Sequence, residues 1–356
     1  MKSCILGAGV SGSLFSYLSG FPVYDKARFV GGRTSHSVST GSKYDFGATI
    51  LHKSILLKIG EQTYRFELEK FIQAFTPDCK LLPIRGMNDK FYLEQGANHL
   101  CIELTKNQKL FLEYKVQKLE KQNNSWKIFF ENQESILVDF CIITFPIPQI
   151  LNVLPETLKE TWENFLQNTK EYRPCLTLTG FWDKTFNLNQ AFKTLPYITY
   201  LIEDKDVEYF SIESEKYEGI SHVILVQFSK EFSEKYFDYW MQSNKVPGSI
   251  VYSLKDQIFS KVFSKLNIPY QSPKEIRVHR WRYSTPTKTI FGHETGILLN
   301  ENWSEYQKIC KTHNLWIVSD LLFGKSVLHS LLGSLLVWES FSNQSEWKDS
   351  FLTPIS

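Results

Sequence analysis

Three closely spaced glycines near the N-terminus constrain the fold of this 356-residue chain more than any other feature. A short apolar run, residues 3–6, leads into Gly7-Ala8-Gly9-Val10-Ser11-Gly12, and residues 13–18 can continue as a helix. In this order Gly7 permits a tight turn, Gly9 lets the backbone approach a pyrophosphate, and Gly12 lets helix and strand pack closely. The N-terminus of the helix would face the phosphate charge. The segment therefore predicts a dinucleotide-binding strand, turn and helix.

An acidic residue ends the next predicted strand, residues 23–25. The Asp25 carboxylate can accept hydrogen bonds from both hydroxyls of an adenosine ribose, and its charge disfavours a 2′-phosphate. Asp25 follows Gly12 by only 13 residues, whereas the acid usually stands about 20 residues after the motif. We therefore expect a short helix that ends near Ser19 and Gly20. The alternative interpretation of Asp25 is a surface residue in a turn.

A second glycine cluster follows within a few residues, where residues 26–33 read KARFVGGR and residues 44–48 read YDFGA. A nicotinamide dinucleotide needs only the first glycine loop. FAD is extended, and its pyrophosphate, ribityl chain and flavin need further close approach of the backbone. The small residues that permit this approach, together with one charged donor, are Gly31, Gly32, Gly47, Ala48 and Arg33. The two clusters predict FAD as the cofactor.

The order of these motifs and several later segments resembles the flavin-dependent amine oxidase superfamily, and within it renalase and its bacterial relatives. The most diagnostic segment is VHRWRY, residues 278–283, which closely resembles a run of the bacterial renalase-like proteins. The other matching segments are QGANHL at 95–100, IITFPIPQ at 142–149 and LWIVSD at 315–320. The resemblance extends through most of the chain.

The resemblance implies contacts to FAD beyond the glycine clusters. The backbone of Val116 would contact adenine, and Asp320 at the end of the last strand would bind the ribityl chain. The further cofactor contacts that it implies are Val10, Ser11, Lys26, Thr49 and Val327.

The VHRWRY segment also holds the candidate catalytic residues. Trp281 is a candidate wall of the flavin pocket, Tyr283 a candidate hydrogen-bond partner of the substrate, and His279 a candidate acid–base group. The alternative role of each is packing within an aromatic-rich core, since aromatic residues make up 15% of the chain.

The resemblance implies an α/β fold, with a Rossmann-like FAD-binding domain of the glutathione-reductase type and a second, α+β substrate domain on a mainly antiparallel sheet. The expected FAD-binding domain comprises residues 1–60, 92–148 and 284–356, and the expected substrate domain comprises residues 61–91 and 149–283. Alternation of residues supports strands at 175–181 and 222–228. Residues 254–266 have helical spacing that is typical of packing.

Three functions are compatible with these features. The first is a renalase-like oxidase, in which FAD takes hydride from a dihydronicotinamide-type donor and passes the electrons to oxygen. The second is amine oxidation, although RPCLTLTGFW, the strand after the Pro-x-Pro segment, lacks the lysine that the amine-oxidising relatives carry there. The third is an FAD-binding protein that is redox-inactive or acts only with a partner. Ser319 departs from the family's glycine, and His329 replaces one of a small pair.

Composition argues against several other classes. The net charge is +2 and the basic residues are spread among nearly equal numbers of acids, so we expect no nucleic-acid partner. None of the six cysteines forms a CxxC pair or stands at metal-ligand spacing from a histidine, which predicts buried free thiols and no metal site.

The apolar stretches favour neither a membrane span nor a signal peptide. The most apolar later stretch, residues 315–338, contains Asp320, Lys325 and His329. Glycines interrupt the N-terminal apolar run. We therefore expect a cytoplasmic enzyme with a small-molecule substrate, and its oligomeric state stays open.

Overall fold

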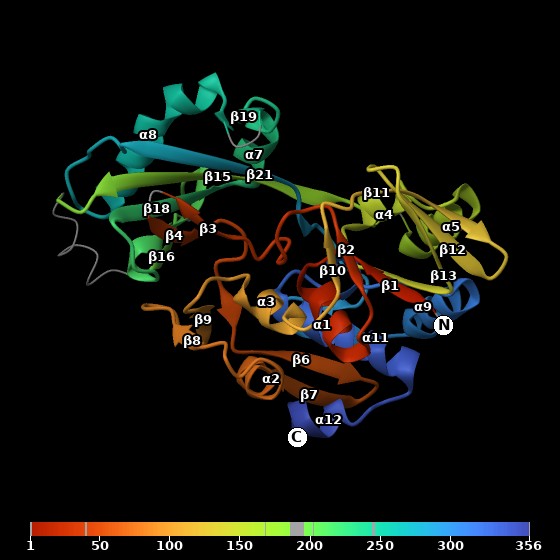
Figure 1. Ribbon diagram of the computed structural model, residues 1–356. Helices are drawn as coiled ribbons and strands as arrows, with labels where there is room; N and C mark the ends of the chain where they lie inside the picture. Colours follow the sequence, from red (N-terminus) through yellow and green to blue (C-terminus); the bar gives the residue numbers. More distant parts are fainter. Residues whose placement is uncertain are drawn as a thin grey trace.

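The computed structural model describes residues 2–39, 41–167, 169–185, 196–201, 203–243 and 246–355. The fold is mixed α/β, with several sheets arranged in two main regions (Figure 1). One region contains a parallel sheet and the other an antiparallel sheet. The long strands β15 (Tyr172–Asp183) and β21 (Glu275–Pro286) belong to the antiparallel sheet and extend toward the parallel one (Figure 1).

The parallel sheet has the strand order β10-β2-β1-β14-β24. Its strands are β1 (Ser3–Leu6), β2 (Val23–Asp25), β10 (Leu110–Leu112), β14 (Phe140–Ile143) and β24 (Leu315–Ile317). Every residue of β1, β14 and β24 is buried. Parallel strands are covered on both faces, and continuous apolar runs such as these satisfy both faces at once.

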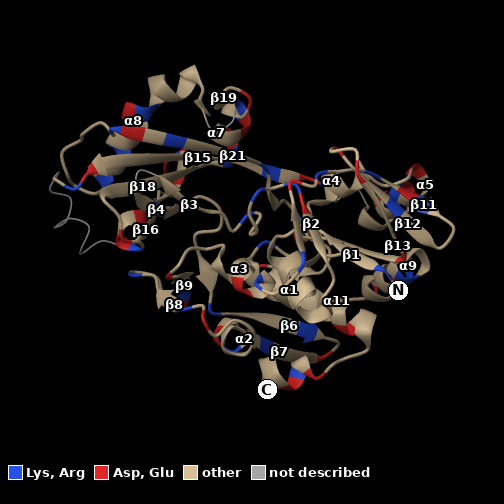
Figure 2. Cartoon of the chain, in the orientation of Figure 1, with Lys and Arg blue, Asp and Glu red and all other residues tan. Residues whose placement is uncertain are grey.

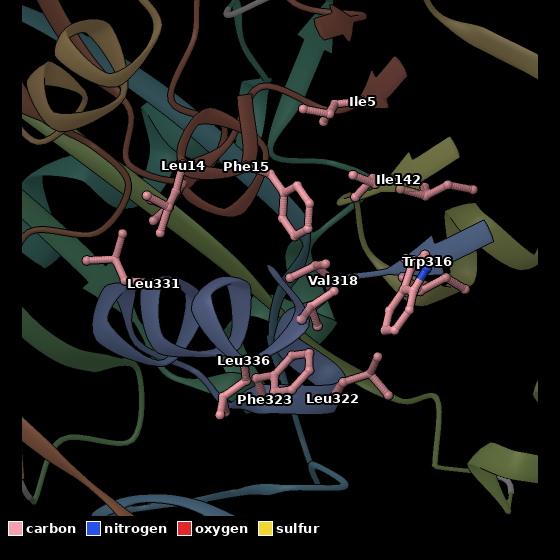
Figure 3. Packing of buried hydrophobic residues seen from close by; sticks show 14 of the residues in the cluster. Ile5, Leu14, Phe15, Ile142, Trp316, Val318, Leu322, Phe323, Leu331 and Leu336 are labelled. Carbon is pink, nitrogen blue, oxygen red and sulfur yellow. The ribbon is translucent and has the colours of Figure 1, made fainter. Parts of the chain in front are cut away.

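Two helices, α1 (Val10–Ser19) and α11 (Val327–Ser342), pack against each other beside this sheet. Figure 3 shows Leu14 and Phe15 of α1 and Leu331 of α11 in one apolar cluster with strand residues such as Ile5 and Trp316. This cluster anchors the N-terminal halves of both helices to the parallel sheet.

The short first helix is confirmed. Helix α1 ends at Ser19, and Gly20 follows with a φ of 70°, where its amide donates to the carbonyl of Ser16. A glycine in the left-handed region is the usual way to end a helix. The early stop explains how Asp25 can end β2 only 13 residues after Gly12.

The antiparallel sheet has the order β16-β17-β18-β15-β21. Its remaining strands are β16 (Ile198–Tyr200), β17 (Val207–Ile212) and β18 (Ser221–Phe228). The strands predicted at 175–181 and 222–228 are confirmed within β15 and β18. The predicted helix is confirmed as α8 (Ser249–Lys265), which buries Ile258 and Val262. A separate apolar core forms here.

Smaller sheets and helices complete the fold. The strands are β3 (His36–Ser39), β4 (Ser42–Asp45), β5 (Leu51–His52), β6 (Ser54–Ile59), β7 (Gln62–Glu67), β8 (Leu81–Pro83), β9 (Lys90–Leu93), β11 (Val116–Gln122), β12 (Ser125–Phe130), β13 (Ser135–Val138), β19 (Met241–Ser243), β20 (Val246–Pro247), β22 (Gly292–His293), β23 (Gly296–Leu299) and β25 (Leu352–Ile355). The helices are α2 (Leu68–Phe75), α3 (His99–Thr105), α4 (Ile147–Leu151), α5 (Glu156–Leu166), η1 (Glu213–Glu215), α7 (Lys230–Tyr236), α9 (Asn302–His313), α10 (Asp320–Phe323) and α12 (Trp347–Phe351).

The apolar cluster of the parallel sheet also contains residues from the two segments that we expect to form the substrate domain. Phe66 and Phe71, from the segment 61–91, and Trp162, from the segment 149–283, are buried in the same apolar cluster as the parallel sheet. The physical reason is pairing: β7 pairs with β6 and β25, which holds α2 against that cluster. One apolar core of the antiparallel sheet is formed by residues 176–278, and Ile84 and Tyr92 pack with Ile198, Tyr209 and Leu225 of the same sheet in a second cluster.

All six cysteines are buried and free, as the sequence predicts. No helix in the described part of the chain is both long and apolar enough to cross a membrane.

Candidate functional site

The glycine loop after β1 takes the conformation that its motif requires. Gly7 has a φ of 108°, and a Cβ at Gly12 would lie 1.8 Å from the carbonyl oxygen of Gly7. A hydroxyl closes the turn, because Oγ1 of Thr144 donates to that oxygen at 3.0 Å. Neither glycine can therefore carry a side chain without a change in the backbone.

Gly9 differs from both neighbours. Its φ is −77°, which any residue can adopt, and no atom lies within 4 Å of the position where its Cβ would stand. Gly9 is also the N-cap of α1, and no side chain caps the helix there. The N-terminal amides of a helix, left without a side-chain cap and beside open space, form a suitable binding site for a phosphate.

The second glycine cluster lies directly against the first. The amide of Gly31 donates to the carbonyl of Ala8 at 2.8 Å. Gly32 has a φ of 54°, and a Cβ there would stand 3.3 Å from the Cα of Gly9. The two clusters thus form one backbone-lined surface, which is why the chain needs glycines twice within so short a stretch.

Asp25 supports this surface from the end of β2. Its Oδ2 accepts from the amide of Ala8 at 2.6 Å, and its Oδ1 accepts from the amide of Ala27 at 2.7 Å. Asp25 thus ends a strand of the parallel sheet, and its bond with Ala27 also begins the turn that follows the strand. A carboxylate oxygen can accept more than one hydrogen bond, so the predicted contact with a ribose remains compatible with this geometry.

Arg33 joins the second cluster to the far end of the chain. Its Nη1 donates to Oδ2 of Asp320 at 2.5 Å. The same nitrogen donates to the carbonyls of Tyr283 at 3.0 Å and Ser284 at 2.9 Å. Asp320 is almost wholly buried, and its other oxygen accepts from the hydroxyl of Tyr172 at 2.7 Å. Burial, followed by the charge of Asp320, raises the pKa of Tyr172, so this hydroxyl stays a donor.

The predicted shelf of small residues follows the same loop. The amide of Ala48 donates to the carbonyl of Arg33 at 2.7 Å, and a Cβ at Gly47 would lie 2.0 Å from that oxygen. Thr49, next in the chain, points to the antiparallel sheet, where its hydroxyl lies 3.1 Å from that of Tyr209. The close contact between position 47 and the carbonyl of Arg33 means that the protein's own backbone requires a glycine there.

An aromatic wall stands beside this shelf. The rings of Phe46 and His279 stack with centroids 3.8 Å apart, and Trp281 donates from Nε1 to the carbonyl of Phe46 at 3.1 Å. These three residues line a cavity of about 350 Å³, with Arg280 in its wall. Tyr283 lies farther along β21, where its ring meets that of Tyr172 edge to face.

His329 lies in the first turn of α11, which Val327 begins. Its Nδ1 lies 2.6 Å from the hydroxyl of Ser326. Its Nε2 lies 3.0 Å from the carbonyl of His293 and 3.1 Å from that of Gly296. Two carbonyl acceptors require a proton on Nε2, so Nδ1 accepts from Ser326. Burial lowers the pKa of His329, and the ring is a neutral brace against the β22–β23 hairpin.

Helices α1 and α11 meet near their N-termini, where the hydroxyl of Ser11 lies 3.4 Å from the carbonyl of Ser330. The buried Val10 and Val327 begin these two helices. Two other predicted contacts lie apart from these interactions. Lys26 is exposed on the loop after β2, and Val116 begins β11 in a separate three-stranded sheet.

Sequence reasoning did not single out three residues that hold the site together, namely Tyr172, Phe46 and Thr144. Thr144 lies in the IITFPIPQ segment, and Phe46 directly precedes Gly47. Both residues could therefore have been identified from the motifs in the sequence. Tyr172 had no signal, because its partner Asp320 is 148 residues away.

A second ionic group lies nearby, and we call Asp45, Glu213 and Lys216 the Lys216 cluster. Nζ of Lys216 lies 2.9 Å from Oε1 of Glu213 and 3.3 Å from Oδ2 of Asp45. His36 contacts the other oxygen of Asp45 through Nδ1 at 2.8 Å. The Lys216 and Glu213 side chains have no exposed surface. The cluster joins β4 to the end of β17.

Comparison with known proteins gives structural matches only. No family model matches the sequence, and no curated protein matches it. A protein assigned as protoporphyrinogen oxidase from Exiguobacterium sp. 255-15 aligns with a TM-score of 0.65 at 10% identity, over 96% of this chain and 99% of its own. Reduced UDP-galactopyranose mutase aligns with a TM-score of 0.63 at 13% identity, over 98% and 97%.

A redesigned putrescine oxidase aligns with a TM-score of 0.59 at 9% identity, over 96% of this chain and 99% of its own. At these identities the likeness concerns the fold. The chain shares the fold of these three proteins over nearly its whole length.

Proposed function

We propose that this chain is an FAD-dependent oxidoreductase, with the parallel sheet and α1 as a Rossmann-like, glutathione-reductase-type FAD-binding unit. The observation that carries the proposal is the open space at Gly9, at the uncapped N-terminus of α1 and against Gly32. A ligand that needs close backbone contact would account for a glycine there, because no neighbouring group of the protein fills the space beside it. Two of the three proteins that share the fold are oxidases by name, and the third is a mutase in its reduced form.

The chemistry of each residue indicates which part of FAD it would contact. The amides at the start of α1 would hold the pyrophosphate, and Asp25 the adenosine ribose. Arg33 and Asp320 would orient the ribityl chain. The antiparallel sheet would carry the substrate side, within the expected segments 61–91 and 149–283.

The glycine loop offers a direct test of FAD binding. Gly9→Val should leave the free energy of unfolding within about 1 kcal/mol of the parent protein, since a helix N-cap tolerates such a change at that cost. The same variant should lose FAD, because the side chain fills the space next to the phosphate site. Gly12→Ala is the contrast, since its Cβ would clash with Gly7 and it should lose stability as well.

The measurement is the flavin absorbance of the purified protein, with FAD added to any colourless preparation. The parent protein should purify yellow and release FAD when it is denatured. A parent protein that neither contains FAD nor takes it up would contradict the proposal. So would a stable Gly9→Val variant that binds FAD as well as the parent.

For the reaction, we infer a renalase-like oxidation of a dihydronicotinamide-type donor with oxygen as the electron acceptor. FAD, when bound, supplies the acceptor for the hydride. The protein supplies a planar wall, formed by Phe46 with the stacked His279 and by Trp281. Arg280 adds a positive charge to the cavity, which suits a donor that carries phosphates. A dihydronicotinamide ring, which is already reduced and uncharged, needs no strong base to give up its hydride.

The structure gives less support to amine oxidation than to oxidation of a dihydronicotinamide-type donor. Strand β15 contains no lysine, and the buried Lys216 is already engaged by two carboxylates. Amine oxidation nevertheless stays the second candidate, since putrescine oxidase shares the fold. A redox-inactive FAD protein is the third outcome of the same experiment.

Rapid anaerobic mixing separates the three candidates. The flavin band should bleach with the 2- or 6-dihydro isomers of NAD(P) and should change little with monoamines. Trp281→Ala should slow that bleaching far more than it weakens FAD binding, because close stacked approach of the donor sets the rate. Fast bleaching by amines alone would favour the second candidate, and no bleaching by either donor would favour the third.

A further inference from the structure

A cavity of about 430 Å³ lies apart from the glycine loops and the aromatic wall, between the sheet β5-β9-β8 and strands β6 and β7. None of the residues predicted to contact FAD lines it. Its volume falls within the range of about 300–1,000 Å³ that small-molecule sites occupy. Figure 2 shows basic residues on β6 and β7 in this part of the molecule.

Strand register brings the lining side chains together. The cross-strand pairs that line the cavity are His52 with Lys90, Ser54 with Glu67, and Leu56 with Arg65. Residues directly opposite each other in antiparallel strands project on the same side. Lys53 and Asp89 complete the wall. The cavity is therefore built on strands rather than on a single loop.

Lys90 has an unusual partner for a lysine. Its Nζ lies 2.7 Å from Nδ1 of His52, which must accept the bond because an ammonium can only donate. Burial, followed by the charge of Lys90, lowers the pKa of His52 to about 4, so the ring is neutral near pH 7. The hydrogen bond therefore does not neutralise Lys90, which feels the charge of Asp89 without forming an ion pair with it.

The wall carries an excess of positive charge. Three cations, Lys53, Arg65 and Lys90, face two carboxylates, and one of these, Glu67, lies 3.6 Å from Lys70 outside the cavity. In the described part of the chain, no ion pair joins any of the three cations to a carboxylate. Cations in a concave site, without carboxylate partners, are the groups that bind anions.

We propose that this cavity binds a small organic anion through a carboxylate or phosphate group, held between Lys90 and Arg65. The proposal goes beyond the oxidoreductase function and does not depend on it. The ammonium and the guanidinium provide charge-assisted hydrogen bonds, and Leu56 and Ser54 provide a mixed floor for the rest of the ligand.

The test is isothermal titration of the full-length protein with sodium phosphate and with sodium citrate, against sodium chloride at matched ionic strength. At least one of the two anions should bind, and the one that binds tells phosphate from carboxylate chemistry. Lys90→Met and Arg65→Gln should each weaken that binding by roughly tenfold, the effect of one lost charge-assisted hydrogen bond. The matched control is Lys43→Met, an exposed strand lysine without an ion pair in the described residues.

Binding that is equal in all three variants would show a nonspecific charge effect and overturn the proposal, as would the absence of heat with both anions. If Lys90→Met does not fold, Arg65→Gln decides, because Arg65 is exposed and its replacement removes no ion pair. The flavin absorbance of each variant should match that of the parent. A variant that loses FAD but still binds the anion would count against the proposed function alone. A variant that keeps FAD but no longer binds the anion would involve only the anion site.

Discussion

Two ionic groups connect the parallel-sheet region to the antiparallel sheet, and they differ in exposure. Arg33 retains 34% of its side-chain exposure, and its pair with Asp320 lies along the backbone surface proposed for FAD. The Lys216 cluster is closed to solvent, and two carboxylates share a single lysine. An ion pair that stays partly open leaves its cation accessible to a ligand, whereas the loss of one partner from a closed cluster leaves a buried charge uncompensated.

The charges of the Lys216 cluster are themselves uneven. Burial raises the pKa of Glu213. Burial would also raise the pKa of Asp45, but the charge of Lys216 and the hydrogen bond with His36 outweigh it and lower that pKa. Asp45 has hydrogen bonds from His36 and Tyr217 in addition to the contact with Lys216, and these further lower its pKa. The same residue types are thus closed to solvent in the Lys216 cluster, where we expect them to serve stability, and partly open at the Arg33 pair, where the proposed function gives them a role in binding.

Lys216→Met should produce the largest effect. The substitution leaves the buried Glu213 without a cation and Asp45 with only His36 beside it, and removal of one partner from a buried ion pair typically costs about 3–5 kcal/mol. Urea denaturation followed by tryptophan fluorescence measures the loss, and Lys43→Met is the exposed control. A loss of unfolding free energy below about 1 kcal/mol is typical of surface ion pairs. Such a result would contradict the distinction between the closed Lys216 cluster and the partly open Arg33 pair.

Asp320→Ala should act mainly on the cofactor. It removes the carboxylate that orients Arg33 and Tyr172, and the proposed function then predicts FAD affinity lower by roughly 10- to 150-fold, from about 1.5–3 kcal/mol per charge-assisted bond. Tyr172→Phe removes only one neutral donor and should weaken FAD binding less. Fluorescence titration with FAD measures both. Equal FAD affinity in the parent and Asp320→Ala would mean that the Arg33–Asp320 pair does not contribute to FAD binding.

Asp25→Ala should weaken FAD binding about tenfold through lost charge-assisted hydrogen bonds. Asp25→Asn should lose less, because the amide oxygen still accepts from Ala8 or from the ribose. The same titration applies, together with urea denaturation to separate loop support from ligand contact. Unchanged FAD affinity in both variants would leave Asp25 as a brace of the glycine loop alone.

The smallest effects are opposite pH dependences within the Lys216 cluster. Asp45 has a folded pKa below its ordinary 3.8, so its contribution is present above that value and is lost as the pH falls below it. Glu213 has a folded pKa above its ordinary 4.5, so its contribution is present below pH 4.5 and is lost as the pH rises through the folded value.

The experiment compares the free energy of unfolding of the parent with that of Asp45→Asn and Glu213→Gln from pH 3 to pH 7. The advantage of the parent over Asp45→Asn should shrink below pH 3.8. Its advantage over Glu213→Gln should shrink above pH 4.5. Parallel curves for both variants would mean that the two carboxylates share the lysine evenly.

The sequence alone determined the features that depend on local backbone geometry. Gly7 is required by its positive φ and Gly12 by a contact within the same turn, Gly20 stops α1, and the alternation in β15 and β18 follows from burial on a sheet. Such features need only neighbours within a few residues or one strand partner. For that reason the glycine surface and both kinds of sheet were predictable.

Only the tertiary structure decided which side chains meet. Arg33 contacts Asp320, which lies 287 residues away in the sequence, and Asp45 contacts Lys216, which lies 171 residues away. No local pattern encodes these pairs, since their proximity depends on how β4, β17, β21 and α10 are placed by the packing of two separate cores. The orientation of His329 was hidden for the same reason, because its partners lie on the β22–β23 hairpin and its position in sequence gave no sign of them.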